Sequence, residues 1–150
     1  MTHDEGVPGP MKRAVAAGLA YFGIILALGF VLGVLRTLFV LPLVGEMAAI
    51  IIELPIILGL AWIVCRRLVR QFRLPLVLAA RLVMGMVAFA LLMIGELSVS
   101  VLLGGRSLAE HLALYRQVPH LLGLAGQVAF ALFPALQSWL TGRRSASPSR

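Results

Sequence analysis

Five ionisable residues stand inside or at the edges of long apolar runs, and they are the residues best placed to do chemistry. Glu53 and Arg81 lie within the runs, and Arg36, Glu46 and Glu96 lie near their ends. A charge at the centre of a membrane helix costs about 2.5–3.5 kcal/mol on insertion scales, so such residues usually face other helices and have a partner. The pattern predicts an intramembrane polar cluster inside a helical bundle.

Depth along straight helices indicates which of these residues can pair. At a rise of 1.5 Å per residue, Arg36, Glu96 and Glu46 lie about 33, 30 and 27 Å from one membrane side. By the same rise Glu53 lies about 17 Å and Arg81 about 8 Å from that side. We therefore expect Arg36 to pair with Glu46 or Glu96, and Arg81 to reach toward Glu53. The alternative left open is that Arg81 extends to the lipid headgroups and Glu53 is protonated.

Small residues share helix faces with these charges. Gly29 and Gly33 form a GxxxG motif one turn before Arg36, and Gly85 and Ala88 follow Arg81 at helical spacing. Small side chains allow two helix backbones to approach closely in a membrane. We expect all four residues to be helix-packing positions, within the bundle or between copies.

The composition indicates which solvent surrounds the protein. Of 150 residues, 61% are apolar and 13% are charged, and the mean hydropathy is +1.01. So few polar side chains could not cover the apolar surface of a soluble protein. The protein is therefore predicted to lie in the lipid bilayer. Its expected partners are the bilayer and either a second copy of this chain or another membrane protein.

Four apolar runs are long enough to be membrane helices, with predicted spans at 14–35, 46–64, 76–97 and 120–140. They predict an all-α fold, a transmembrane four-helix bundle over residues 14–140. The short connection at 36–45 contains Pro42 and Gly45, and Pro55 predicts a kink beside Glu53. The polar stretches 1–13 and 141–150 are predicted to be disordered cytoplasmic tails.

Residues 108–117 are predicted to form a short amphipathic helix on the membrane surface, just before the last span. Ser107 and Glu110 fit a capping box, and Leu108, Leu112 and Tyr115 recur at helical spacing. An ordinary loop with one helical turn is the alternative that the sequence leaves open.

The basic residues indicate the orientation, because Lys and Arg accumulate on the cytoplasmic side of membrane proteins. With both termini in the cytoplasm, nine basic residues lie on that side: Lys12, Arg13, Arg66, Arg67, Arg70, Arg73, Arg143, Arg144 and Arg150. The opposite side has three: Arg36, Arg106 and Arg116. Short clusters of this kind leave no basic face for a duplex, so no nucleic-acid partner is expected.

No enzyme or metal motif is found. The sequence contains no glycine-rich phosphate loop, HExxH motif or paired-cysteine motif. His111 and His120 lack a third metal ligand, and Cys65 is expected to be a buried apolar residue. We therefore expect no catalytic residue, cofactor or metal.

Several of these residues together resemble a family of small bacterial four-span inner-membrane proteins with no known activity. The resemblance is carried by Gly33-Val34-Leu35-Arg36, Pro42, Gly45, Glu46, Glu53-Leu54-Pro55, Arg81, Gly85, Glu96 and Ser107-Leu108-Ala109-Glu110, and it covers residues 20 to 140. It implies a location in the bacterial inner membrane and no enzymatic activity.

Two functions remain after this comparison. The first is a non-enzymatic accessory or packing component that binds other membrane helices. The second is a small oligomeric transporter or channel, proton-coupled through Glu53. The feature that separates them is whether Glu53 faces a water-filled cavity. A membrane enzyme using Glu53 or Glu96 is disfavoured, because no nucleophile or metal site accompanies them.

Overall fold

The computed structural model describes residues 9–145, and this part of the chain is helical with no strand. The elements are α1 (Pro10–Leu35), η1 (Arg36–Val40), α2 (Leu41–Gln71), α3 (Leu78–Ser98), η2 (Val99–Leu103), α4 (Leu108–Leu114) and α5 (Val118–Ser145). The all-α class is therefore confirmed. Residues 10–13 and 141–145 are helical, in contrast to the predicted disorder, and the rest of both predicted tails lies outside the described residues.

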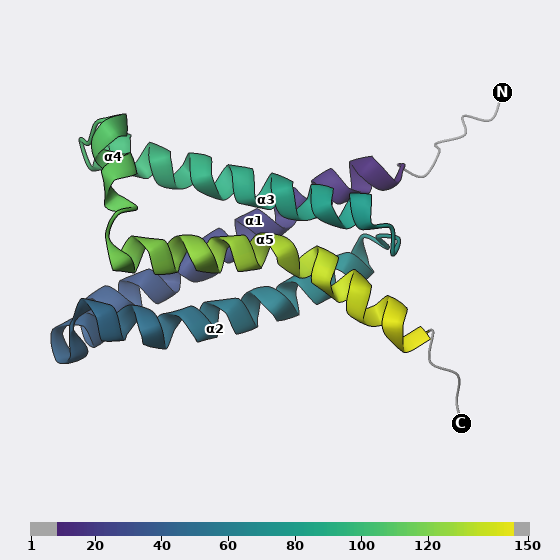
Figure 1. Cartoon of the computed structure of the whole chain (residues 1–150), viewed down its shortest axis with the longest axis horizontal. Helices are drawn as coiled ribbons and strands as arrows, with labels where there is room; N and C mark the ends of the chain where they lie inside the picture. The colour runs from purple at the N-terminus through teal and green to yellow at the C-terminus, as the bar shows by residue number, and fades with distance from the viewer. Residues whose placement is uncertain (1–8, 146–150) are drawn as a thin grey trace.

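Helices α1 and α2 form one apolar segment that folds back on itself (Figure 1). The predicted connection at 36–45 is mostly helical, because the π-helical turn η1 leads directly into α2. Pro42 lies in the first turn of α2, where its missing N–H costs nothing. Gly45 has φ 79°, a conformation that favours glycine, and it is the one non-helical residue within α2. The backbone of α2 thus leaves the helical conformation at Gly45, and the kink beside Pro55 stays a prediction.

Three helical segments are long and apolar enough to cross a membrane: Pro10–Gln71, Leu78–Leu102 and Val118–Arg143. The first is 62 residues long and includes the fold-back between α1 and α2. These segments are what a membrane protein requires, and they agree with the membrane location inferred from composition.

The four long helices surround a common centre, with α1 against α3, α3 against α5, α5 against α2, and α2 against α1. Figure 1 shows that α1 begins and α5 ends at the same end of the bundle as residues 72–77. We refer to this as the terminal end. The opposite end, with η1 and α4, is the α4 end.

Close backbone approaches fix the half of the bundle toward the terminal end. A Cβ added at Gly85 would overlap the carbonyl of Ala131 in α5, and one at Gly18 would lie 2.7 Å from the carbonyl of Met84. Ala88 is fully buried nearby. Gly85 and Ala88 thus pack helices as predicted, whereas Gly18 was not anticipated.

The GxxxG motif of α1 does not pack against another helix of this chain. Among the described residues, no atom of another helix lies within 4 Å of the position that a Cβ would take at Gly29 or Gly33. Of the two predicted uses of this motif, the contact within the bundle is therefore wrong. A contact between copies stays a prediction.

A filled core surrounds these approaches and extends from them toward the α4 end. Tyr21 stacks on Phe130 with 4.2 Å between ring centroids, and its hydroxyl donates a hydrogen bond of 3.3 Å to the Phe130 carbonyl. Met84 and Cys65 are fully buried in the same core, so the reading of Cys65 as a buried apolar residue is confirmed. This core separates the two ends of the bundle.

Helix α4 has the predicted capping box. The Ser107 hydroxyl accepts from the Glu110 backbone N–H, and a Glu110 carboxylate oxygen accepts from the Ser107 backbone N–H at 2.7 Å. The helix ends at Leu114 and is shorter than the predicted 108–117. Leu108 and Leu112 are exposed, while His111 is buried against Tyr115. Its contact with a membrane surface stays a prediction.

Candidate binding cavity at the α4 end

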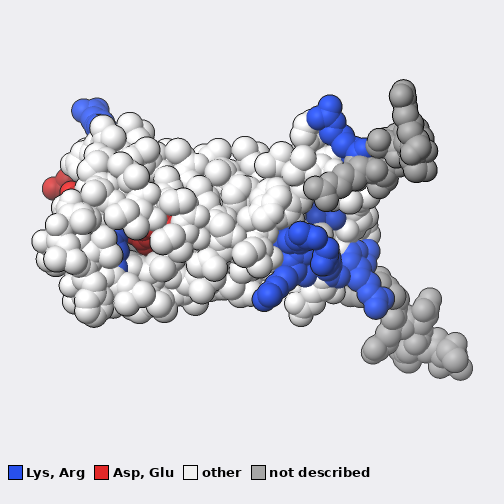
Figure 2. Space-filling model, turned by 90° about the horizontal axis from the view of Figure 1, so that it is seen from below, with Lys and Arg blue, Asp and Glu red and all other residues white. Residues whose placement is uncertain are grey.

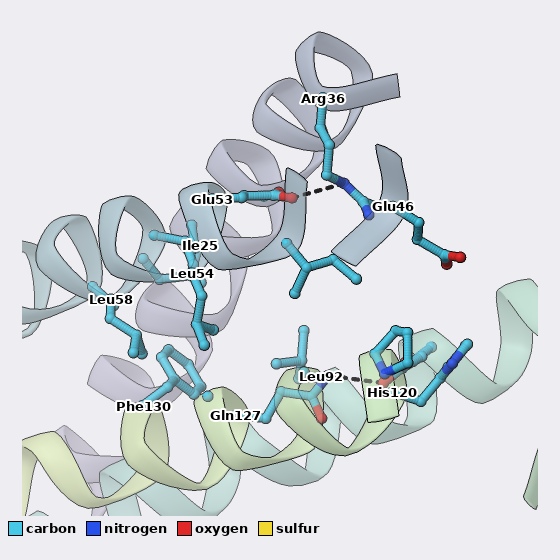
Figure 3. A pocket seen from close by; sticks show the side chains of 18 residues that line it. Ile25, Arg36, Glu46, Glu53, Leu54, Leu58, Leu92, His120, Gln127 and Phe130 are labelled. Carbon is cyan, nitrogen blue, oxygen red and sulfur yellow. Dashed lines mark hydrogen bonds and ion pairs between the residues drawn. The ribbon is translucent and has the colours of Figure 1, made fainter. Parts of the chain in front are cut away.

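A cavity of about 510 Å³ opens among α1, α2, α3 and α5 toward the α4 end (Figure 3). Its volume lies within the range of small-molecule pockets. The side nearest the filled core is apolar and includes Ile25, Ala61 and Phe130. Its polar lining consists of Arg36, Glu46, Glu53, Glu96, His120 and Gln127.

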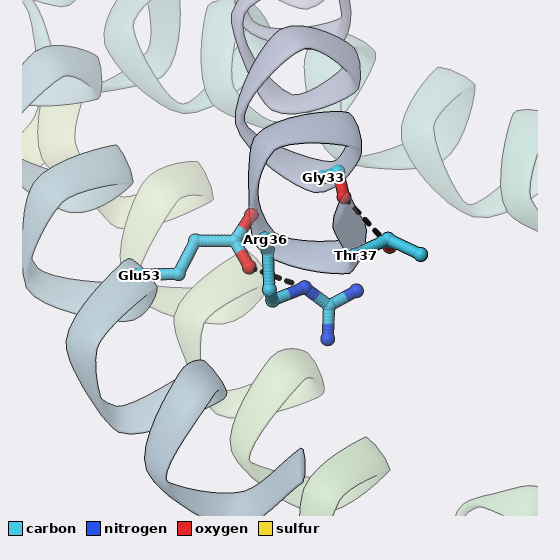
Figure 4. A network of polar contacts seen from close by, with 4 residues as sticks. All are labelled: Gly33, Arg36, Thr37 and Glu53. Carbon is cyan, nitrogen blue, oxygen red and sulfur yellow. Dashed lines mark hydrogen bonds and ion pairs between the residues drawn. The ribbon is translucent and has the colours of Figure 1, made fainter. Parts of the chain in front are cut away.

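Arg36 pairs with Glu53 across the fold-back between α1 and α2 (Figure 4), with 2.7 Å between Nε and Oε2. The contact is an ion pair by distance, although the N–H makes no aligned hydrogen bond. The side chains of Arg36 and Glu53 are 31% and 20% exposed. The predicted pairing of Arg36 with Glu46 or Glu96 is therefore wrong.

The position of the α2 terminus explains this error. The depth argument ended the second span at Val64, but α2 continues to Gln71. Glu53 therefore lies about 27 Å from the terminal end of its helix at 1.5 Å per residue, rather than about 17 Å. At this greater depth, Glu53 is close enough for the Arg36 side chain to reach it.

Arg81 lies in the other half of the molecule, so its predicted contact with Glu53 is wrong as well. Its Nε donates to the carbonyl of Pro75 at 2.9 Å, and its Nη2 donates to the carbonyl of Leu74 at 3.1 Å. The residue is 4% exposed, so it does not extend to headgroups as the alternative proposed. Arg81 lies in the first turn of α3, where the loop carbonyls just before the helix are within reach.

Glu96 is held by Gln127, which the sequence analysis did not name, and by Tyr115, which it assigned only to the apolar stripe of the surface helix. Its Oε2 accepts from Gln127 Nε2 at 2.9 Å and lies 3.5 Å from the Tyr115 hydroxyl. Partial burial, followed by the charge and hydrogen bond of Glu96, raises the pKa of Tyr115 above its ordinary value. Tyr115 therefore stays protonated and acts as a donor to the carboxylate. The sequence offered one clue to both partners of Glu96: Tyr115 and Gln127 each have a polar group within or beside an apolar run.

Two further polar atoms in the cavity have no hydrogen-bond partner among residues 9–145. They are His120 Nδ1 and Gln127 Oε1, and both are buried. Figure 3 shows His120 and Gln127 facing Arg36 and Glu53 across the cavity. Since the Gln127 amide nitrogen donates to Glu96, its oxygen is left as an acceptor that requires a donor.

The cavity has more carboxylates than cations. Glu46, Glu53 and Glu96 line it, against the single guanidinium of Arg36. Glu46 is exposed, and in Figure 3 its carboxylate points away from the Arg36–Glu53 pair. The site can therefore accept hydrogen bonds from a cation without first breaking its own ion pair.

The structure brings five of the nine predicted site residues to this cavity: Gly29, Arg36, Glu46, Glu53 and Glu96. It leaves out Gly33, Arg81, Gly85 and Ala88. Within the described chain, no group of three His, Cys, Asp or Glu residues is placed to hold a metal ion. The expectation of no metal or cofactor stays a prediction.

Comparison of the chain with protein-family models, curated proteins and solved structures finds no match. The resemblance to the four-span family therefore stays a prediction. The geometry of the cavity carries the functional argument.

Proposed function

We propose that this protein is a four-span membrane protein whose cavity binds a small organic ammonium ion from the side of the α4 end. Both termini lie in the cytoplasm under this proposal, and the membrane is the bacterial inner membrane. The observation that carries the proposal is the placement of the carboxylates. Of the four acidic residues between positions 9 and 145, three line this one cavity.

The lengths and charges of the helices support the four-span topology. Helices α1 and α2 contain 26 and 31 residues, and each exceeds the roughly 20 residues needed to cross the hydrocarbon core. The basic segment 66–73, which is the last part of α2 and the two residues after it, lies at the terminal end, as the positive-inside rule expects of a cytoplasmic side. Reporter fusions after residues 40, 70, 112 and 145 should read outside, inside, outside, inside. An inside signal at 112 would contradict the topology.

The buried Gln127 Oε1, which accepts no hydrogen bond, indicates that the ligand is a hydrogen-bond donor. An ammonium N–H can donate to Gln127 Oε1 and to the neighbouring carboxylate of Glu96, which gives a buried acceptor its missing partner. The apolar wall of Ile25 and Phe130 suits a hydrocarbon or ring on the same molecule. A primary amine with one apolar group meets both requirements.

The position of Glu53 favours this function over an accessory role. A protein that only packs against other membrane helices has no need of a cavity lined by three carboxylates, whereas a binding or transport protein does. The core of Tyr21 and Phe130 closes the cavity toward the terminal end. Transport would therefore need this stack to move, and proton coupling would need the Arg36–Glu53 pair to open.

The binding test uses three probes of nearly equal shape. Purified protein in a neutral detergent is titrated calorimetrically with 2-phenylethylammonium, 2-phenylethanol and phenylacetate. We expect the ammonium ion to bind best, because it alone donates a charged N–H. Glu96→Gln should weaken its binding by about ten- to a hundredfold, the range for a hydrogen bond to a charged group.

Glu110→Gln is the matched control, because Glu110 lies at the same end but outside the cavity. It should leave the affinity unchanged. Equal binding of the alcohol and the ammonium ion would show that the site is only apolar. No binding of any probe would favour the accessory protein that binds other membrane helices.

A further inference from the structure

A second cavity, of about 560 Å³, lies at the terminal end between α2, α3 and α5. Its lining includes four arginines: Arg66, Arg70, Arg73 and Arg81. Among residues 9–145, no carboxylate lines it. Arg81 is held by the loop carbonyls of Leu74 and Pro75, and this brings a buried positive charge to the wall of the cavity.

The terminal end has no carboxylate to neutralise these arginines within the described chain. The acidic residues of that part are Glu46, Glu53, Glu96 and Glu110, and the first three line the other cavity while Glu110 caps α4. The one ion pair among residues 9–145 is the pair at the α4 end. Figure 2 shows Lys and Arg gathered at the terminal end and acidic side chains toward the opposite end. An anion that is not among the described residues would balance the charge of the cavity.

Arg73, which lines this cavity, has an unusual backbone conformation. Arg73 directly follows the C-cap of α2 with φ 48°, in the left-handed region where glycine is the usual residue. Its carbonyl accepts a hydrogen bond from Arg13 Nη1 at 3.2 Å, which ties the loop to α1. An arginine at this strained position places a cation at the mouth of the cavity, where glycine would end the helix with less strain.

The remaining walls suit the junction of a headgroup and a hydrocarbon chain. Gln137 of α5 donates from Nε2 to the Trp62 carbonyl of α2 at 3.0 Å, and this bond holds the two helices together along the cavity. Leu76 and Leu140 add apolar surface beside the arginines. A phosphate with attached acyl chains fits such a lining, because its two parts need the two kinds of surface.

We propose that this cavity binds the phosphate headgroup of an anionic phospholipid in the leaflet at the terminal end. Inorganic phosphate shares the chemistry of the headgroup, but under the four-span topology proposed above the ends of α2 and α5 and the start of α3 lie at the membrane surface, where lipid is the phosphate source. Basic pockets between membrane helices recognise anionic lipid headgroups in this way. The proposal is independent of the ligand proposed for the other cavity.

Native mass spectrometry of the full chain from a neutral maltoside detergent tests the proposal. Phosphatidylglycerol, phosphatidylcholine and inorganic phosphate are added separately, and the fraction of protein that retains each is measured. The protein should retain phosphatidylglycerol in preference to the other two. The double variant Arg66→Gln with Arg70→Gln should weaken this binding by about thirtyfold, the expected effect of removing two arginines near the surface.

Arg67→Gln is the matched control, since Arg67 lies beside Arg66 on the same helix, is exposed and does not line the cavity. It should retain the lipid as the unmodified protein does. An equal loss in the control and in the double variant would overturn the site. Equal retention of phosphatidylcholine, or preferential retention of inorganic phosphate, by the unmodified protein would overturn the lipid assignment even if the variants failed to fold.

Discussion

The two ends of the bundle differ in how closely their helices approach. Toward the terminal end, glycines at 18 and 85 bring backbones into contact around a filled core. Toward the α4 end, glycines at 29 and 33 meet no neighbour, and the helices separate around a cavity lined by carboxylates. Residues of the same type therefore have opposite consequences, since the position of the neighbouring backbone decides whether a glycine closes a contact or leaves space.

Charge follows the same division. The acidic residues of the described chain lie at the α4 end, and four arginines line a cavity at the terminal end without a carboxylate beside them. The core of Tyr21, Phe130 and Met84 lies between the two regions. One small bundle thus presents two cavities of opposite charge, which suits each to a ligand of the opposite sign.

The largest expected effect comes from filling a close contact. Gly85→Leu should lower the free energy of unfolding by about 3 kcal/mol or more, because its side chain meets the backbone of Ala131, which cannot rotate away. Thermal melting in detergent measures the change. Gly33→Leu is the matched control and should melt as the unmodified protein does. Equal destabilisation by both substitutions would show that the two halves do not differ in packing.

An intermediate effect is expected from the Arg36–Glu53 pair. Glu53→Leu should cost roughly 2 kcal/mol of stability, less than for a fully buried pair because both side chains are partly exposed. Adding Arg36→Met should recover part of that loss, since the unpaired cation is then gone. Adding Arg81→Met should not, because Arg81 is bound to loop carbonyls. Rescue by Arg81→Met instead would contradict the observed pairing.

The smallest effect concerns the capping box of α4. Hydrogen bonds from the backbone and side chain of Ser107 lower the pKa of Glu110 below its ordinary value. A lowered pKa in the folded state stabilises α4 above the ordinary pKa of a glutamate, about 4.3, and this stabilisation is lost as pH falls through the lowered value. Amide chemical shifts of residues 108–114 should report fraying at acid pH. In Glu110→Gln these shifts should not change over the same range, and a pH response like that of the unmodified protein would exclude Glu110 as its source.

Much of the architecture could be predicted because it depends on local patterns. Apolar runs predicted the long helices, and the spacing of Ser107 and Glu110 predicted the cap of α4. The helix ends were less accurate, because α2 extends seven residues beyond its predicted end at Val64. Arg66 and Arg70, which follow the predicted span 46–64, lie in this last part of α2.

What the sequence by itself determined is the approximate position of the long helices and the capping box of α4. Only the tertiary structure decided that Arg36 pairs with Glu53, that Arg81 binds loop carbonyls, and that Gly85 closes a contact while Gly29 borders a cavity. The physical reason is that helical periodicity is a property of neighbouring residues along the chain. Pairing depends on where each helix turns back and how far it extends, and the seven-residue extension of α2 moves a side chain by about 10 Å along the helix axis.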